Sequence, residues 1–344
     1  MSKKFDVVIG NPPYQEEAQG TSTRDVPIYN HFMNAAYEMG EKVILITPAR
    51  FLFNAGLTPK KWNEKMLNDS HLSVPIYVAD SGKLFPGTDI KGGIAVTYRD
   101  TTAHGDPIGT FSRHSELNEI LKKVRERSEG SLSDAIASSS LYRYTESMHA
   151  NEPHAAGLMS STAQYKVNTN AFEQLHSIFH EEIPDDGCEY TLIHGLVKNK
   201  RRFRWIKSEY ITRPSPFYDY TVAVPAANGS GTFGEVLSNP VITKPNEATT
   251  QSFINIGSFS ERSEAEACLS YLKTKFARAM LSILKITQHN LAKAWRHVPS
   301  QDFSSGSDID WTRSIPEIDQ QLYAKYSLSE DEIAFIDTNV KPMS

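Results

Sequence analysis

The chain has 344 residues but only two cysteines, Cys188 and Cys268, and these lie far apart. A disulfide framework and a four-cysteine zinc site are therefore excluded, and a reducing cytoplasm is the simplest location. Long hydrophobic runs are also missing, since none approaches the ~18 apolar residues that a membrane helix needs. We expect a cytoplasmic protein that makes no membrane contact.

A large excess of charge of one sign is missing as well. The formal net charge is -5, from 36 lysines and arginines against 41 acidic residues. This argues against a polybasic protein, so any contact with nucleic acid must come from local clusters of charge. Hydrophobic residues make up 39% of the chain, enough for a sizeable core, and the length favours two or more domains.

Residues 1–105 alternate apolar runs with helical periodicity. Strands are predicted at residues 5–10, 43–46, 74–78 and 93–98, and helices at residues 27–39 and 60–67. This order is typical of an α/β unit with a largely parallel sheet, and it predicts half of a doubly wound, Rossmann-like domain. A linker over residues 106–140 contains one helix at residues 115–127.

After residue 140 the pattern changes to short strand-like runs broken by proline, glycine and asparagine. We expect a mixed α+β domain over residues 141–305, with its longest helix at residues 261–287. Residues 306–344 predict a helical tail, in which Ser329 and Glu332 form a capping-box pattern. The strand-like runs of the mixed domain are residues 190–197, 203–211, 220–224, 236–242 and 251–256.

Asn11, Pro12, Pro13 and Tyr14 directly follow the first predicted strand. The prolines make a rigid turn at the carboxyl end of a strand, the edge where open α/β sheets bind ligands. The Asn11 side-chain oxygen and the Pro12 carbonyl oxygen are two fixed acceptors for the N–H groups of a ring-conjugated amine. Such contacts localise the lone pair on nitrogen, and Tyr14 can stack on a base flipped out of the duplex.

This turn resembles the catalytic motif of the N6-adenine DNA methyltransferases, which is Asn, Asp or Ser, two prolines and an aromatic residue after a sheet strand. The resemblance implies that Asn11 and Pro12 orient the amine and that Tyr14 holds the flipped adenine. Phe85, which precedes the strand at residues 93–98, is similar in place to the second aromatic partner of the base. A core phenylalanine at a strand end is the alternative for Phe85.

The resemblance extends to residues 224–235, 267–287 and 310–343. These look like the target-recognition region of bifunctional type II restriction-modification enzymes, whose long chains join nuclease, methyltransferase and recognition domains. The chain then corresponds to the rear portion of such an enzyme. The resemblance implies double-stranded DNA as substrate and S-adenosylmethionine as methyl donor.

The cofactor site is expected to be largely missing from this chain. In the family, an aromatic-x-Gly-x-Gly turn lies well upstream of the catalytic turn, whereas ten residues precede Asn11. The one Gly-x-Gly-x-x-Gly pattern, Gly229, Gly231 and Gly234, leads into an extended segment that ends at Pro240, not into a helix. We interpret it as a loop between recognition strands, and we leave the cofactor-binding residues unknown.

Positive charge is concentrated at residues 198–207, with six cations in ten residues on a strand-like run. Contact with DNA phosphates is the natural use of such a stripe, and its arginines can also read guanine edges. A solvated basic face is the alternative. The predicted DNA-binding residues are Lys198, Lys200, Arg201, Arg202, Arg204, Trp205 and Lys207.

Two metal-dependent alternatives are weaker, and we expect no metal. Asp80, Asp89 and Lys91 have the spacing of a magnesium nuclease, but they lie in a loop that the methyltransferase resemblance already explains. His176 and His180 are i, i+4 on a predicted helix, but no carboxylate or cysteine accompanies them as a zinc ligand.

The sequence thus predicts site-specific adenine-N6 methylation of DNA within a restriction-modification system, by a chain that needs a cofactor-binding half. The alternative is a non-catalytic DNA-binding subunit or remnant that works beside a partner chain. A sheet without its leading strands would expose an apolar edge, which favours association with a second chain that carries the cofactor-binding half.

Overall fold

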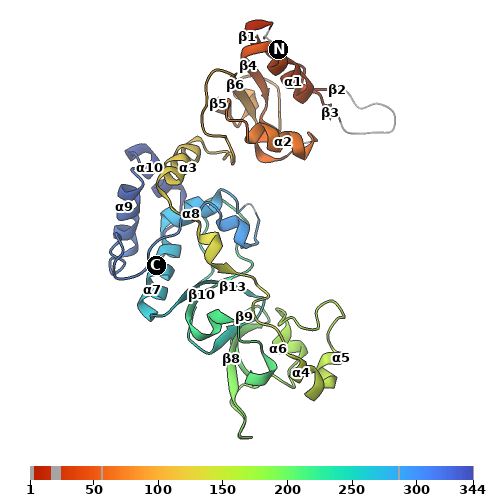
Figure 1. Cartoon of the computed structure of the whole chain (residues 1–344), viewed down its shortest axis with the longest axis vertical. Helices are drawn as coiled ribbons and strands as arrows, with labels where there is room; N and C mark the ends of the chain where they lie inside the picture. The colour runs from red at the N-terminus through yellow and green to blue at the C-terminus, as the bar shows by residue number, and fades with distance from the viewer. Residues whose placement is uncertain (1–3, 17–24, 56, 286, 344) are drawn as a thin grey trace. The chain divides into compact units, whose positions relative to one another are not determined.

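The computed structural model describes residues 4–16, 25–55, 57–285 and 287–343. The chain divides into two compact units, Met1–Asn118 and Glu119–Ser344. Figure 1 shows their elements. Within the described residues, no helix combines the length and the apolar character that a membrane span requires.

A four-stranded sheet in the order β1, β4, β6, β5 forms the centre of the first unit (Figure 1). β1 and β4 are parallel, whereas β6 is antiparallel to both of its neighbours. Two neighbouring parallel strands need a crossover connection, usually an α-helix, that returns the chain to the other end of the sheet. The segment between β5 and β6 contains no α-helix, and these two strands pair antiparallel. All four strands were predicted, but the prediction of a largely parallel sheet was wrong for β6. The strands are β1 Phe5–Gly10, β4 Gly40–Pro48, β5 Leu72–Val78 and β6 Ile94–Asp100.

Two helices, α1 (Tyr29–Met39) and α2 (Lys60–Leu67), supply the core on one face of this sheet. Trp62 of α2 packs against Tyr29 and Phe51, and its indole Nε1 donates to the Asn34 side chain of α1 at 3.0 Å. Both helices therefore cover the side of the sheet that Val43 and Leu45 of β4 face. The smaller elements of this unit are β2 Gln15–Glu16, β3 Val26–Pro27, and the 3-10 helices η1 Ala49–Phe53 and η2 Ser81–Lys83.

β1 presents an apolar surface and a free edge. Phe5, Val7 and Ile9 are 55%, 51% and 72% exposed, and they alternate with Val8, which packs against the core. Because side chains alternate along a strand, these three lie on the opposite face from α1. β1 is also the end strand of its sheet, so its second hydrogen-bonding edge has no partner strand among the described residues. Such an edge is a template for pairing with another strand.

The second unit contains a four-stranded sheet in the order β11, β10, β13, β7 and a three-stranded sheet in the order β12, β8, β9. Its longest strand pairing is the antiparallel hairpin of β8 and β9, which extends from the rest of the unit (Figure 1). The strands are β7 Ile136–Ala137, β8 Tyr190–Val197, β9 Lys200–Lys207, β10 Tyr220–Pro225, β11 Val241–Thr243, β12 Glu247–Thr249 and β13 Phe253–Phe259. The 3-10 helices are η3 Leu132–Ala135, η4 Ser208–Tyr210, η5 Ser215–Tyr218 and η6 Ala292–Trp295.

The helix predicted at residues 261–287 is broken in two, and Ile286 of that range lies outside the described residues. α7 (Arg262–Lys273) ends at Thr274, whose extended backbone has φ -60° and ψ 150°, and α8 (Lys275–Ser282) begins after it. The carboxylate of Asp319 accepts the first two backbone N–H groups of α8 at 3.0 and 2.9 Å. The prediction of a single helix was therefore wrong, because a side chain distant in the sequence caps the start of a second helix at this point.

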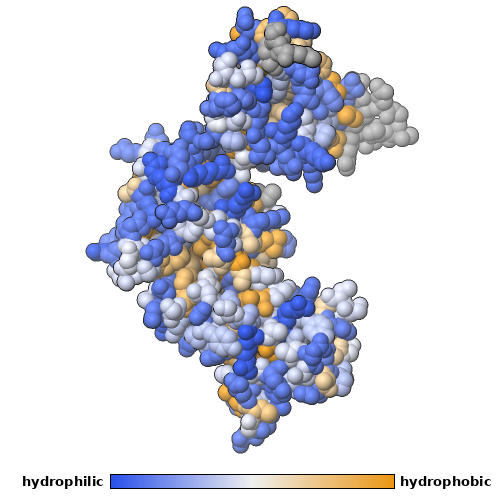
Figure 2. All heavy atoms as spheres, viewed as in Figure 1, coloured by the Kyte–Doolittle hydropathy of each residue, from blue (hydrophilic) through white to orange (hydrophobic). Residues whose placement is uncertain are grey.

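Two further helix predictions agree closely with the structure. α3 (Ser115–Arg127) occupies the predicted connecting segment, and Ser329 and Glu332 form the predicted capping box of α10 (Glu330–Asn339). In the space-filling view, hydrophilic residues cover most of the visible surface and apolar residues show as smaller patches (Figure 2). The other helices are α4 Glu146–Asn151, α5 Pro153–Gly157, α6 Ala171–Gln174 and α9 Ile315–Lys325.

Candidate active site

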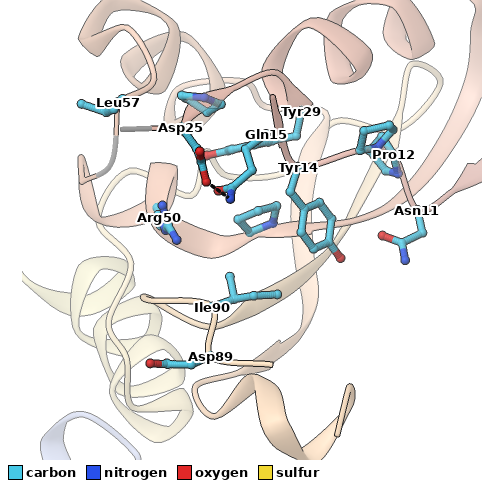
Figure 3. Close-up of a pocket in the computed structure, with 13 residues that line it drawn as sticks. Asn11, Pro12, Tyr14, Gln15, Asp25, Tyr29, Arg50, Leu57, Asp89 and Ile90 are labelled. Atoms are coloured by element: carbon cyan, nitrogen blue, oxygen red, sulfur yellow. Dashed lines mark hydrogen bonds between the residues drawn. The ribbon is translucent and has the colours of Figure 1, made fainter. Parts of the chain in front are cut away.

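The Asn11 to Tyr14 turn lies at the carboxyl end of β1, as predicted, and it lines a pocket of about 560 Å³ (Figure 3). Three connections meet at this edge of the sheet. β4 runs parallel to β1 and ends at Pro48, and β6 runs the opposite way, so the loop before β6 starts from the same edge. The pocket is lined by Asn11, Pro12, Pro13, Tyr14, Gln15, Asp25, Pro27, Tyr29, Pro48, Arg50, Leu57, Asp89 and Ile90.

Asn11 and Tyr14 have different environments. The Asn11 side chain is exposed, whereas Tyr14 is half-buried and its ring lies in the pocket view with the hydroxyl towards Asn11 (Figure 3). Burial raises the pKa of the Tyr14 hydroxyl, and the neighbouring Asn11 side chain only partly offsets this rise. The phenol is therefore neutral at physiological pH. The Tyr14 carbonyl accepts the Ile28 N–H at 3.1 Å, which ties the turn to the start of α1.

Other pocket residues fix the walls. Gln15 donates through Nε2 to the Asp25 carboxylate at 2.6 Å, across the short β2 and β3 pair. Tyr29 is 2% exposed, and burial raises its pKa to about 12. Sequence reasoning missed Tyr29, Arg50 and Asp89 as pocket residues. The rule that ligands bind beyond the carboxyl ends of strands could have suggested Arg50, which follows the predicted strand at residues 43–46.

Phe85 does not line this pocket. Its half-buried side chain belongs to the turn after η2, where its carbonyl accepts the Thr88 N–H and hydroxyl at 3.1 and 2.7 Å. Asp89 and Ile90, from the same loop, line the pocket instead. The role of Phe85 as a second aromatic partner stays a prediction.

The acidic residues considered as metal ligands bind other groups of the protein. Asp80 caps η2 by accepting the Gly82 N–H at 3.0 Å, and Asp89 pairs with Lys91 at 2.6 Å. Within the described ranges, no group of three or more His, Cys, Asp or Glu side chains is placed to hold a metal ion. His176 lies beyond α6, which ends at Gln174, so the expected helical spacing with a second histidine was wrong.

The glycine pattern at Gly229, Gly231 and Gly234 surrounds a side chain of its own unit. Glu235 accepts the Ser230 N–H at 2.8 Å and the Gly231 N–H at 3.1 Å, and it also accepts a hydrogen bond from the Lys285 ammonium group. An internal carboxylate therefore occupies two backbone N–H groups of the loop, and a third, that of Gly234, donates to the Ser282 hydroxyl at 3.2 Å. This agrees with the interpretation of the pattern as a loop, and these residues do not fit a cofactor cradle.

Strand β9 and the turn before it carry the predicted DNA-binding stripe. The hairpin closes at the Val197 and Lys200 pair, leaving a two-residue turn of Lys198 and Asn199 with φ of 48° and 59°. Successive side chains on β9 face opposite sides of the sheet, so the charges do not form one continuous face. Trp205 is half-buried, and its backbone pairs with His180.

Several cations of the stripe already have partners within the unit. Arg204 donates to Glu181 at 2.5 Å, and Lys207 lies 3.3 Å from the Asp186 carboxylate. Arg201 donates to a backbone carbonyl.

The exposed side chains of Lys198, Lys200 and Arg202 form no ion pair among the described residues. These three therefore have the charge most accessible for DNA.

The first part of the chain is similar in sequence to a known family of enzymes. Residues 1–85 match the model of the Eco57I restriction-modification methylase family. An uncharacterized adenine-specific methylase of Mycoplasma pneumoniae is 32% identical over 122 residues, which cover 34% of this chain and 29% of that protein. The chain is thus similar to restriction-modification methylases.

Two solved structures are more distantly similar. The type IIG restriction endonuclease BpuSI gives a TM-score of 0.33 at 12% identity, covering 92% of this chain and 48% of that chain. The type IIL restriction-modification enzyme MmeI, solved in complex with DNA, gives a TM-score of 0.34 at 9% identity, covering 97% of this chain and 56% of that chain. The chain spans less than a third of the curated relative and about half of each of these structures.

Proposed function

We propose that this chain carries the catalytic turn and the recognition domain of an enzyme that methylates adenine N6 in specific DNA sites, within a restriction-modification system. The observation that carries the proposal is the Asn11 to Tyr14 turn, held at the carboxyl end of β1 in an open pocket. The match of residues 1–85 to a restriction-modification methylase family supports it. The cytoplasm, where DNA is accessible, is the proposed location.

The residues of the turn act on the target amine. The Asn11 Oδ1 and the Pro12 carbonyl oxygen accept its two N–H groups, which favours a pyramidal nitrogen with a localised lone pair. Tyr14 stacks on the face of the flipped adenine, and its neutral phenol adds no charge beside the base. Proline at positions 12 and 13 fixes the backbone, so the acceptors need not reorganise.

S-adenosylmethionine is the proposed methyl donor, and we propose that a second chain supplies its binding half at the free edge of β1. The apolar side chains of Phe5, Val7 and Ile9 would be buried by such a chain, and an added parallel strand would satisfy the free edge. The glycine loop of this chain holds Glu235 and offers no alternative cradle.

Methylation is tested in the organism that encodes the chain. DNA from the parent strain and from a strain with the gene deleted is mapped for N6-methyladenine by sequencing and by nucleoside mass spectrometry. Loss of methylation at one sequence context in the deletion strain is the expected result. Identical methylation in both strains would contradict the proposed function.

Cofactor binding is tested by calorimetric titration of the purified chain with S-adenosylmethionine. We expect no binding by folded protein that still retains duplex DNA. Saturable one-to-one binding by the chain alone would contradict the proposal that a second chain supplies this site, and it would leave the methylation proposal intact.

A further inference from the structure

We infer that Arg50 binds a backbone phosphate of the target DNA strand beside the flipped adenine. This inference rests on the proposed function, because it places the base at the Asn11 to Tyr14 turn. Arg50 is the second residue of η1, directly after β4, and it lines the same pocket as Asn11 and Tyr14 (Figure 3).

The stem of Arg50 is held by the loop before β6. Its Nε donates to the Lys91 carbonyl at 2.8 Å, and a Cβ on Gly92 would lie 3.1 Å from the Arg50 Cγ. Gly92 has φ of +89°, a conformation that favours glycine, so the loop backbone can approach the stem closely. Ala49 donates its backbone N–H to the Gly93 carbonyl at 3.0 Å. The guanidinium is therefore positioned by its neighbours before any ligand binds.

The two Nη groups of Arg50 have no partner among the described residues. Arg50 forms no ion pair there, and its single side-chain hydrogen bond uses Nε. The two carboxylates that line the pocket are engaged elsewhere, since Asp25 accepts from Gln15 and Asp89 pairs with Lys91, each at 2.6 Å. A planar guanidinium with free donors suits a phosphate or a carboxylate, both of which accept two parallel hydrogen bonds.

The position of Arg50 favours a phosphate of the DNA. A flipped adenine stays joined to the phosphates on both sides of its sugar, so these must pass the mouth of the pocket. Asn11 follows the edge strand β1, whereas Arg50 follows β4, the next strand inwards. The proposed cofactor-binding half joins at the far side of β1. The carboxylate of S-adenosylmethionine would therefore approach from the side of Asn11, not from the side of Arg50.

A neutral backbone analogue tests the contact. The full chain is titrated with a short DNA duplex that carries one adenine opposite an abasic position, which lowers the cost of flipping. In two further duplexes the phosphate on one or the other side of that adenine is a methylphosphonate. We expect the wild-type affinity for one of these two duplexes to be about ten-fold lower than for the unmodified duplex, because one charge-assisted contact is lost. The Arg50→Gln variant should bind that duplex and the unmodified duplex with equal affinity.

Controls separate this inference from the proposed function. Lys65→Gln removes an exposed cation of α2 outside the pocket and should keep the full methylphosphonate effect, as should Asn11→Ala. Arg50→Lys keeps the charge without the planar fork and should recover part of the affinity.

An equal methylphosphonate effect in wild type and Arg50→Gln would overturn the inference. So would a cofactor effect, in which Arg50→Gln weakens S-adenosylmethionine binding by the complete enzyme and leaves DNA affinity unchanged. If the deletion strain keeps its methylation but the methylphosphonate effect depends on Arg50, the proposed function fails and the phosphate contact stands.

Discussion

Replacing Asn11 with alanine removes one of the two acceptors proposed for the target amine. The Asn11 side chain is exposed, so the change opens no cavity, and the free energy of unfolding should change by less than ~0.5 kcal/mol. At a reaction centre, loss of one preorganised hydrogen-bonding group typically lowers kcat by ~10²–10³, or about 3–4 kcal/mol. We therefore expect at least a ~10²-fold loss of methylation with the fold intact.

DNA affinity should be nearly unchanged in the same variant. Tyr14 still stacks on the base, and the cations of the β8 and β9 hairpin lie in the other unit of the chain. The assay follows single-turnover methyl transfer in extracts of the deletion strain complemented with wild type or Asn11→Ala, and it measures duplex binding by fluorescence anisotropy. Glu16→Ala, an exposed change outside the pocket, is the matched control. A severe loss of DNA binding, or retained methylation, would refute the assigned role of Asn11.

Three more expectations concern the hairpin, the glycine loop and Phe85. Replacing Lys198, Lys200 and Arg202 together with glutamine should weaken DNA binding, and the slope of log affinity against log salt should fall by about one unit per lost phosphate contact. Arg204→Gln and Lys207→Gln should change the affinity and this slope less, because those cations pair with Glu181 and Asp186. Glu235→Gln should cost about 3 kcal/mol of stability in denaturant unfolding at neutral pH, because it leaves Lys285, 3% exposed, without its counter-charge. Burial raises the pKa of Glu235, but hydrogen bonds from Lys285 and the loop N–H groups lower it below its usual value, so the advantage of wild type should be complete above about pH 4.3 and lost as the pH falls through the folded pKa. Phe85→Ala should weaken base flipping, measured with 2-aminopurine at the target position, by roughly 1–3 kcal/mol if Phe85 stacks on the base; a change in stability alone would assign it to the core.

Local patterns in the sequence were sufficient for the four main strands and both α-helices that cover them in the first unit, and for β8, whereas the run predicted at residues 203–211 lies three to four residues beyond the bounds of β9. The strand at residues 5–10, the helix at residues 60–67 and the strand at residues 190–197 all match observed bounds. Each is set by hydrophobic periodicity within a few residues. The direction of β6 was not predictable in this way. It depends on whether the segment after β5 carries the chain back across the sheet, and local periodicity does not reveal this.

The break at Thr274 shows a second limit of local reasoning. The apolar face continues across α7 and α8, so periodicity predicts one helix, but Asp319 caps α8 from another part of the chain. Arg50 was missed for a related reason. Its own segment shows only that it follows a predicted strand, and its place in the pocket depends on the pairing of β4 with β1 and on the close approach of Gly92 to its stem.

The turn of the β8 and β9 hairpin has a conformational cost. Both of its residues, Lys198 and Asn199, adopt the left-handed region, which asparagine tolerates well and lysine does so less readily. Glycine at position 198 would relieve this cost, on the order of 1 kcal/mol, but it would remove a cation from the exposed end of the ribbon. Selection for thermal stability alone would thus act against the charge that DNA recognition is proposed to use, so stabilised variants of this protein should be checked for weaker DNA binding.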